Sequence, residues 1–203
     1  MSDSPVLLCF MIGLGLYLGK LWWDDCRDHI AGRPGRAPMP GAVPASTRSC
    51  VIAVIGALII VAAETIGEIA LGLSEEQSEI TILFGLYTLV AAVIEEVIFR
   101  GYLVIEGRGR GAQWAGAIGA SLLFAALHPF LWEWEDAGFA FTFTMKGWFS
   151  TTAVFASSLW FYAARLARWN PSQSLLPCIA AHAAKNAAVF AIKGAQGFVG
   201  GWW

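Results

Sequence analysis

Six long apolar segments dominate the chain, and they restrict it to a fold that lies within a lipid bilayer. The segments run over about residues 5–23, 51–73, 80–105, 112–131, 147–167 and 175–192. Each is close to the ~20 residues that a helix needs to cross the hydrocarbon core of a membrane. With their loops they use up most of the 203 residues and leave no room for a large soluble domain. The sequence therefore predicts an all-α fold, a polytopic transmembrane bundle of about six spans.

Composition agrees with a membrane setting and excludes one large class of partners. The chain is 57% hydrophobic and 14% charged, whereas an ordinary soluble domain is roughly 25% charged. The net charge is −2 and no basic stripe with interleaved aromatic residues occurs, so we expect no nucleic-acid partner. The first partner that the sequence predicts is the bilayer itself.

The loops alternate in charge, and this alternation predicts an orientation. Basic residues lie in the first, third and fifth loops, namely Lys20, Arg27, Arg33, Arg36 and Arg48, then Arg108 and Arg110, then Arg165 and Arg168. The second and fourth loops are mainly acidic, with Glu75, Glu76 and Glu79, then Glu133, Glu135 and Asp136 beside a single Lys146. Because cytoplasmic loops of membrane proteins are enriched in Lys and Arg, we expect the odd loops to be cytoplasmic and both termini outside. Tryptophans near the segment ends are expected to be interfacial anchors.

A stretch rich in proline and glycine divides the chain into two predicted parts. Residues 32–44 contain four prolines and show no periodicity, which is typical of a flexible linker. The first apolar segment lacks the basic start and the small-residue cleavage site of a signal peptide, so we expect it to be retained. The predicted domains are an N-terminal helix with a cytoplasmic linker over 1–50 and a compact core over 51–203.

Three ionisable residues lie together inside the third apolar segment, where charge is expensive. They are Glu95, Glu96 and Arg100. On a helix, residues four apart share a face, so Glu96 and Arg100 are expected to form an ion pair, and that pair could also be purely structural. Glu95, rotated by about 100°, would present a second carboxylate beside it. An unpaired carboxylate in such a place is a candidate general base.

Two further pairs at the same spacing lie in later apolar segments: Phe124 with His128, and His182 with Asn186. His128 could assist in activating water, and His182 and Asn186 could donate hydrogen bonds to a developing oxyanion. A carboxylate, an imidazole and two further donors suit attack by water on a carbonyl group. The residues therefore suggest amide hydrolysis inside a membrane.

These motifs resemble a known family, the glutamate-type intramembrane proteases, which include the CAAX prenyl endopeptidases and the bacterial CPBP (CAAX protease and bacteriocin-processing, or Abi) proteins. The family pattern is E-E-x-x-x-R, then F-x-x-x-H, then H-x-x-x-N, and all three motifs occur here in order. The resemblance covers about residues 80–192. The short chain is more similar to the bacterial branch, which implies an integral protein of the bacterial cytoplasmic (inner) membrane.

The resemblance implies an endopeptidase that cleaves a membrane-associated protein or peptide tail. Glu95, helped by His128, would activate water, His182 and Asn186 would stabilise the oxyanion, and Glu96 with Arg100 would orient the site. We expect no required cofactor. The alternative is zinc bound by Glu95, His128 and His182, a ligand set that Zn²⁺ accepts.

Two other functions stay open on the sequence alone. The same fold could act without catalysis, as a membrane immunity protein against a bacteriocin or as a scaffold, or its polar residues could form an ion or proton pathway. Outside the family motifs, Glu64 and Glu68 are expected to line a wet cavity or to face the interior of the bundle. Lys185 is expected to reach water on another side of its helix from the motif residues.

The predicted spans place two motif residues at unequal depths. Glu95 lies about ten residues from the loop at 108–111 and His128 about seventeen, which at 1.5 Å per residue is a difference on the order of 10 Å. We expect a tilt, a re-entrant start near Ala112 or an interfacial stretch after Arg100 to absorb it.

Overall fold

The computed structural model describes residues 4–33, 35, 37–135 and 138–203, and helices make up most of this part of the chain. The α-helices are α1 (Pro5–Ile30), α2 (Thr47–Ala70), α3 (Ile82–Glu96), α4 (Gly109–Leu127), α5 (Met145–Leu166) and α6 (Leu176–Gln196). A short 3₁₀ turn, η1 (Ser74–Glu76), precedes α3, and a π-helix, η2 (Val97–Tyr102), continues it. Strands β1 (Trp132–Glu135) and β2 (Gly138–Phe141) pair antiparallel between α4 and α5.

Hydroxyl side chains begin four of the helices. The side chains of Ser4, Ser46, Thr81 and Thr144 each accept a hydrogen bond from a backbone N–H in the first turn of α1, α2, α3 and α5, respectively. Such N-caps satisfy donors that the helix cannot pair internally. At the other end of α6, Gly197 adopts φ 86°, a left-handed conformation that glycine accepts without strain. Local sequence thus sets these helix boundaries.

Three helical stretches in the described part of the chain are long and apolar enough to cross a membrane. They are Pro5–Ile30, Thr47–Ala70 and Ile82–Tyr102. Large apolar side chains on α1 and α2 point away from the protein, and Val6, Ile59 and Ile66 are each more than 60% exposed. A continuous apolar exterior is costly in water but favourable in lipid. The helices therefore belong in a bilayer.

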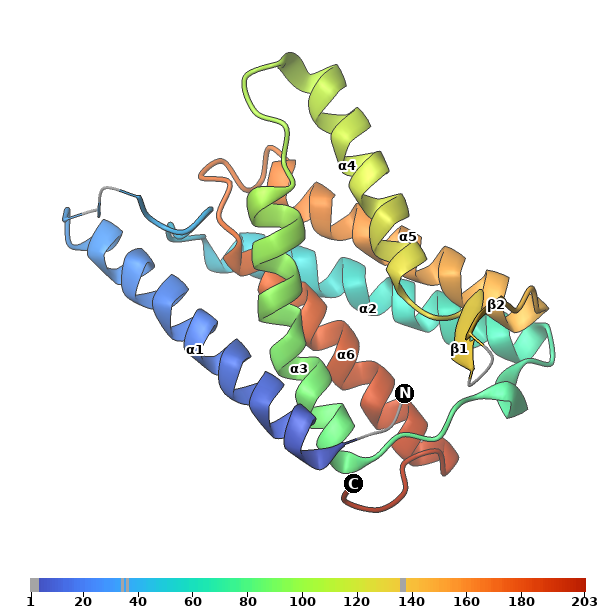
Figure 1. Cartoon of the computed structure of the whole chain (residues 1–203). Coiled ribbons are helices and arrows are strands. Elements are labelled where there is room, and N and C mark those ends of the chain that lie inside the picture. The colour runs from blue at the N-terminus through green and yellow to red at the C-terminus, as the bar shows by residue number, and fades with distance from the viewer. Residues whose placement is uncertain (1–3, 34, 36, 136–137) are drawn as a thin grey trace.

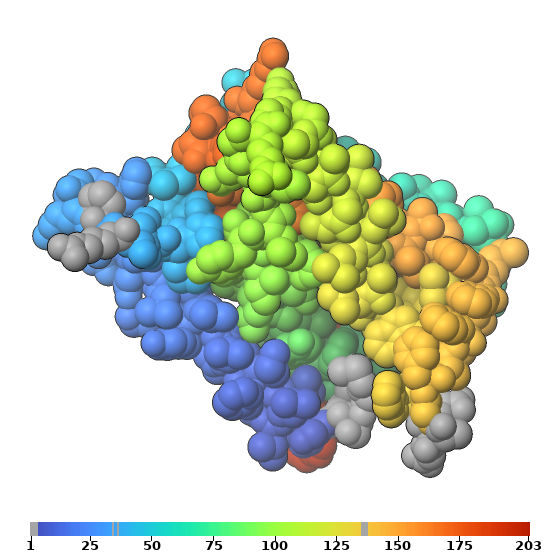
Figure 2. Space-filling view, turned by 45° about the horizontal axis from the view of Figure 1, so that its top comes forward, coloured from blue at the N-terminus to red at the C-terminus, as the bar shows by residue number. Residues whose placement is uncertain are grey.

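Helix α3 lies between α1 and α6, with α2 and α5 packed on the other sides of α6, and α4 lies against α5 (Figure 1). In the space-filling view, α1 in blue flanks the green residues of α3 on one side, and yellow α4 lies on the other (Figure 2).

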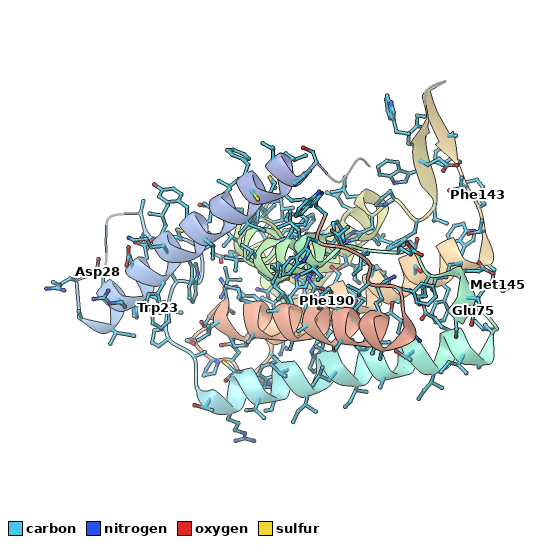
Figure 3. The ribbon with its side chains drawn as sticks, turned by 90° about the horizontal axis from the view of Figure 1, so that it is seen from below. Trp23, Asp28, Glu75, Phe143, Met145 and Phe190 are labelled. Carbon is cyan, nitrogen blue, oxygen red and sulfur yellow. The ribbon has the colours of Figure 1, made fainter. Side chains whose placement is uncertain are left out.

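Glycines permit two of these helix–helix contacts, the one between α1 and α3 and the one between α3 and α6. A Cβ on Gly15 of α1 would lie 2.4 Å from Val90, and one on Gly85 of α3 would lie 2.3 Å from Phe190, which points from α6 in Figure 3.

The all-α prediction needs correction between α4 and α5. The segment expected at 112–131 ends as a helix at Leu127, and the β1–β2 ribbon follows it. His128 has extended dihedral angles (φ −81°, ψ 127°), because the residue before a proline disfavours the α-helical region and Pro129 comes next.

The segment expected at 80–105 ends as a helix at Tyr102, and residues 103–108 are non-helical. This non-helical connection between η2 and α4 lies where the sequence predicted an interfacial stretch after Arg100.

The expectation of a flexible linker over 32–44 is wrong for its second half; Pro34 and Arg36 lie outside the described residues. Ala42 is buried in the main core. The backbone N–H of Met39 donates to Asp25 (2.7 Å), and Trp22 Nε1 donates to the carbonyl of Pro40 (3.2 Å). Because proline has no backbone N–H, a proline-rich segment makes few hydrogen bonds within itself. Its carbonyl groups can therefore accept hydrogen bonds from neighbouring elements. Residues 39–44 therefore pack α1 onto the core.

Candidate active site

Glu96 is the centre of a buried cluster formed by α3, η2 and α6. Its Oε1 accepts a hydrogen bond from Arg100 Nη1 at 3.1 Å, and His182 Nδ1 lies 2.8 Å from the same oxygen. The side chains of Glu96 and Arg100 are both 0% exposed. We call Glu95, Glu96, Arg100 and His182 the Arg100 cluster. The expected ion pair between Glu96 and Arg100 is present, and it is fully removed from solvent.

Glu95 is the accessible carboxylate of the Arg100 cluster. Its side chain is 31% exposed, and its Oε2 lies 3.7 Å from His182 Nε2. This separation is too long for a direct hydrogen bond, but it is short enough for one small molecule to bond to both atoms. Helical rotation of about 100° between consecutive residues accounts for the contrast between buried Glu96 and accessible Glu95.

The ring of His182 is fixed by two contacts, one on its face and one at Nδ1. It stacks on Phe161 of α5 with centroids 4.7 Å apart and an interplanar angle of 21°. An ionised carboxylate can only accept, so Glu96 requires the proton of His182 on Nδ1. That contact leaves Nε2 as the nitrogen that faces Glu95.

The π-helix η2 holds Arg100 in place. Leu103 N donates to the carbonyl of Ile98, five residues back, and such wide turns leave some carbonyls without their usual partners. Side chains of α5 satisfy them: the Tyr162 hydroxyl donates to Phe99 O (2.6 Å) and Arg165 Nε donates to Arg100 O (3.1 Å). The irregular turn is therefore bonded across to its neighbouring helix.

Arg100 has further partners on α5 and lies among aromatic rings. Its Nη2 donates to both the carbonyl and the hydroxyl of Ser158, at 3.0 and 2.6 Å, and Ser158 in turn donates to Ser121 of α4. The centres of the Phe124 and Phe161 rings lie 4.8 and 5.1 Å from the guanidinium carbon. Aromatic faces and the hydrogen bonds of Nη1 and Nη2 offset part of the desolvation of this charge, while the buried Nε has no hydrogen-bond partner among the described residues.

His128 lies at the end of α4, beside the cluster but outside its hydrogen bonds. Its Nδ1 is 2.8 Å from the carbonyl of Phe124. Since a carbonyl only accepts, Nδ1 carries the proton and a neutral His128 has its lone pair on Nε2. Phe124 contacts both imidazoles, with ring centroids 4.8 Å from His128 and 6.2 Å from His182. The two histidines thus flank one phenylalanine ring.

Asn186 faces α3 one turn beyond His182. Its Nδ2 donates to the carbonyl of Thr88 at 2.8 Å. An amide nitrogen has two hydrogens, so one remains for another acceptor. The structure therefore brings the side chains of Glu95, Glu96, Arg100 and His182 into contact at 2.8–3.7 Å. It also places His128 across Phe124 and ties Asn186 to the α3 backbone.

The residues expected for zinc do not meet at one point. Within the described ranges, no group of three or more His, Cys, Asp and Glu side chains is close enough to hold a metal ion. The arrangement of Glu95, His128 and His182 does not fit a tetrahedral ion.

Sequence reasoning missed the side chains of α5 and misplaced two charges. Ser158, Tyr162 and Arg165 follow one another at helical spacing, which was a detectable signal for one polar face. Arg165, expected in a cytoplasmic loop, is only 5% exposed and lies in the last turn of α5. Lys185, expected to reach water, is 9% exposed and lies 3.7 Å from Glu64 of α2.

A second group of charges lies between α2, α5 and α6, and we call Glu64, Glu68, Lys146 and Lys185 the Glu64 cluster. Glu68 pairs with Lys146 and accepts from Gln77 (2.6 Å). Glu64 and Glu68 line a cavity of about 40 Å³, which is roomy enough for water. Of the two alternatives expected for these acids, a wet cavity or the interior of the bundle, the structure shows that both acids lie between helices and line a cavity.

Comparison with known protein families matches residues 77–188, more than half of the chain, to the type II CAAX prenyl endopeptidase Rce1-like family. No curated protein and no solved structure matches the chain. The matched range contains all three sequence motifs and the whole Arg100 cluster. The family implies a protease with a protein substrate, and its match agrees with the apolar helices in indicating a multi-pass integral membrane protein. The chain belongs to the type II CAAX prenyl endopeptidase Rce1-like family.

Proposed function

We propose that this protein is an intramembrane endopeptidase that hydrolyses a peptide bond in a membrane-associated protein or peptide tail. One observation carries the proposal. A partly exposed carboxylate, Glu95, lies 3.7 Å from the free nitrogen of an imidazole whose other nitrogen is held by buried Glu96. A general base beside an imidazole that is held in one orientation is a suitable arrangement for attack by water on a carbonyl.

In the first step, Glu95 accepts a proton from water, and the oxygen of that water bonds to the carbonyl carbon of the substrate. His128 assists from the other side of Phe124, since the lone pair on its Nε2 can accept a hydrogen bond from the same water. Glu95 then returns the proton to the amide nitrogen as the carbon–nitrogen bond breaks. These two steps conserve atoms and charge, and no covalent bond forms between the enzyme and the substrate.

The negative charge that forms on the carbonyl oxygen requires donors, and His182 and Asn186 are in place to supply them. With both nitrogens protonated, His182 donates from Nδ1 to Glu96 and from Nε2 to the oxyanion. Before the attack, His182 and Arg100 balance the charges of Glu95 and Glu96; once Glu95 has taken the proton, they balance the charges of Glu96 and the oxyanion. Asn186 donates one hydrogen to Thr88 and has a second for the oxyanion. Preorganised donors of this kind are often the largest catalytic contribution.

The proposal extends to the placement of the chain in the membrane. Besides α1, α2 and α3, we propose that α4, α5 and α6 also cross, giving about six spans with the N-terminus outside, in a bacterial cytoplasmic membrane. Support comes from α4, where Leu122, Leu123 and Leu127 are each 48–58% exposed. Protease protection of terminal epitopes in sealed vesicles tests this orientation.

We propose that hydrolysis proceeds without a metal, because in the described part of the chain Glu95, His128 and His182 do not lie close enough together to hold one ion. Purified protein is expected to contain well under one zinc ion per chain by elemental analysis, and to keep its activity after dialysis against a chelator. Stoichiometric zinc, together with loss of cleavage that only zinc restores, would contradict this.

A non-catalytic role, as an immunity protein or scaffold, is the alternative. Mass-spectrometric mapping of new protein termini separates the two functions in membranes from cells that express wild type, Glu95→Gln or Glu64→Gln at matched levels. We expect termini that depend on Glu95 and persist in Glu64→Gln, which controls for the loss of an intramembrane acid. Identical maps in all three strains, with any phenotype intact, would exclude proteolysis and favour the alternative.

A further inference from the structure

The β1–β2 ribbon is amphipathic, and its aromatic face is exposed. Residues directly opposite in an antiparallel pair point to the same face, and the register pairs Trp132 with Phe141 and Trp134 with Phe139. These four rings therefore share one face. Trp134, Phe139 and Phe141 are 77%, 50% and 65% exposed. Glu133 and Ala140 pair with each other and point to the opposite face.

The aromatic face continues from the ribbon onto α5. Phe141 stacks on Phe143, and Phe143 stacks on Trp148 in the first turns of α5, with centroids 5.5 and 6.0 Å apart. Phe143, Met145 and Trp148 are each more than half exposed. Figure 3 shows the ribbon extending away from the helices, with Phe143 and Met145 near its base. Contiguous exposed apolar surfaces of this kind mark sites that contact a partner or a membrane.

The ribbon is also attached to the turn that carries His128. The indole nitrogen of Trp132 donates to the carbonyl of Ala126 in the last turn of α4 (2.8 Å), and Phe130 stacks on the His128 ring at 5.9 Å. Gly147 completes the attachment, because a Cβ there would lie 2.2 Å from the carbonyl of Phe130. The ribbon, the His128 turn and the start of α5 form one unit.

We propose that this ribbon is a lipid anchor that inserts its aromatic face into the interfacial layer of the bilayer and thereby fixes the depth of the His128 turn. Lipid is the partner that fits, because the face is continuous with apolar exposed residues of α4 and α5 in an integral membrane protein. Tryptophan and other aromatic rings favour the interfacial layer, while Glu133 on the opposite face is directed to water. The proposal does not depend on the proteolytic activity.

Spin labels on the two faces test the anchor. The labels are placed at Phe139→Cys and, as the matched control, Glu133→Cys, in a background with Cys9 and Cys50 replaced by serine; Cys26 and Cys178 are buried. In phosphatidylcholine vesicles, we expect oxygen to relax the label at 139 more than a water-soluble nickel chelate does, and the reverse at 133. Stronger nickel relaxation at both positions would place the ribbon in water and overturn the proposal. Weak relaxation by both reagents at 139, with dipolar broadening between two labels, would show that the face is covered by a second copy of the chain and would overturn the proposal.

The attachment to the His128 turn is tested separately. A spin label at Leu127, the exposed last residue of α4, is expected to become more mobile in Trp132→Phe, which removes the bond to Ala126 and keeps an aromatic ring. Trp134→Phe changes an exposed ring on the same face and is the control. Equal mobility in Trp132→Phe and the parent would overturn the link between the ribbon and His128.

Discussion

The Arg100 cluster and the Glu64 cluster both place two acids and positively charged groups between helices, yet they differ in how their charges are compensated. In the Arg100 cluster, Glu96 and Arg100 are 0% exposed and their hydrogen bonds are made to other protein groups. In the Glu64 cluster, side chains are 10–18% exposed, the contact between Glu64 and Lys185 is 3.7 Å, and a cavity adjoins both acids. Protein atoms fix the first cluster, whereas water can solvate the second.

This difference is the reason why we propose the Arg100 cluster, and not the Glu64 cluster, as the reactive one. Burial of Glu96 and Arg100 fixes the ring of His182, and that leaves Glu95 as an accessible acid with a defined neighbour. The acids of the Glu64 cluster have lysines for neighbours, whose flexible side chains do not define the position of a reacting atom. Buried charge alone is therefore a weak indicator of catalysis; an accessible acid beside a fixed imidazole is a stronger one.

The largest effect is expected when the accessible acid of the Arg100 cluster is neutralised. Glu95→Gln should lower the rate of cleavage by roughly 10²-fold or more, because the general base is lost, while its partly exposed position leaves the fold intact. The rate is measured on a peptide that spans a terminus found by mass-spectrometric mapping, with the variants reconstituted in vesicles. Glu64→Gln should change the rate less than about threefold, and equal losses in both variants would remove the distinction between the clusters.

Much of the Arg100 cluster could be predicted from sequence, for a specific reason. Glu96 and Arg100 are four residues apart on one helix, so their contact depends only on helical geometry. The contact of Glu96 with His182 joins residues 86 positions apart, and no local rule gives it. The sequence predicted that His182 belongs to the site through the family motifs, but not which atoms it contacts.

The α5 side chains that support the site were missed because sequence rules consider only residues that are close together in the chain. Arg165 was assigned to a loop because it is a basic residue near a segment end. That rule does not say whether its side chain points to solvent or into the protein. The ribbon was treated as a loop, although Trp132–Glu135 alternates apolar and acidic residues with the period of a strand. The π-helix η2 has no sequence signal of its own, because it depends on hydroxyl and guanidinium donors from α5.

The next effect is on stability and concerns the fully buried cation. Arg100→Met should lower the free energy of unfolding by about 3–5 kcal/mol, because Glu96 would lose its ion-pair partner in a site without solvent. The measurement is reversible unfolding in mixed micelles with increasing dodecyl sulfate. Glu96→Gln combined with Arg100→Met should be less destabilised than Arg100→Met alone. A double variant as unstable as the sum of the two singles would show that the pair is not coupled.

A smaller effect is expected where α5 supports the π-helix. Tyr162→Phe removes the donor to the carbonyls of Phe99 and Leu103, and should cost about 1–3 kcal/mol because buried carbonyls lose a partner. Tyr102→Phe is the control, since Tyr102 is 65% exposed at the end of the same turn and its loss should be within about 0.5 kcal/mol. Equal unfolding curves for wild type and Tyr162→Phe would show that η2 does not depend on α5.

The smallest effect is expected in the Glu64 cluster, where water can replace a lost partner. Lys185→Met should lower the free energy of unfolding by only about 1 kcal/mol, because Glu64 lines the cavity and its carboxylate can be hydrated there. Unfolding in the same micelles gives the value directly. A loss as large as that of Arg100→Met would mean that the cavity is dry and that the two clusters are compensated in the same way. Filling the cavity with Thr65→Leu sharpens the comparison: if water is what solvates Glu64, Lys185→Met should become more destabilising in that background, since the site that receives the water is closed.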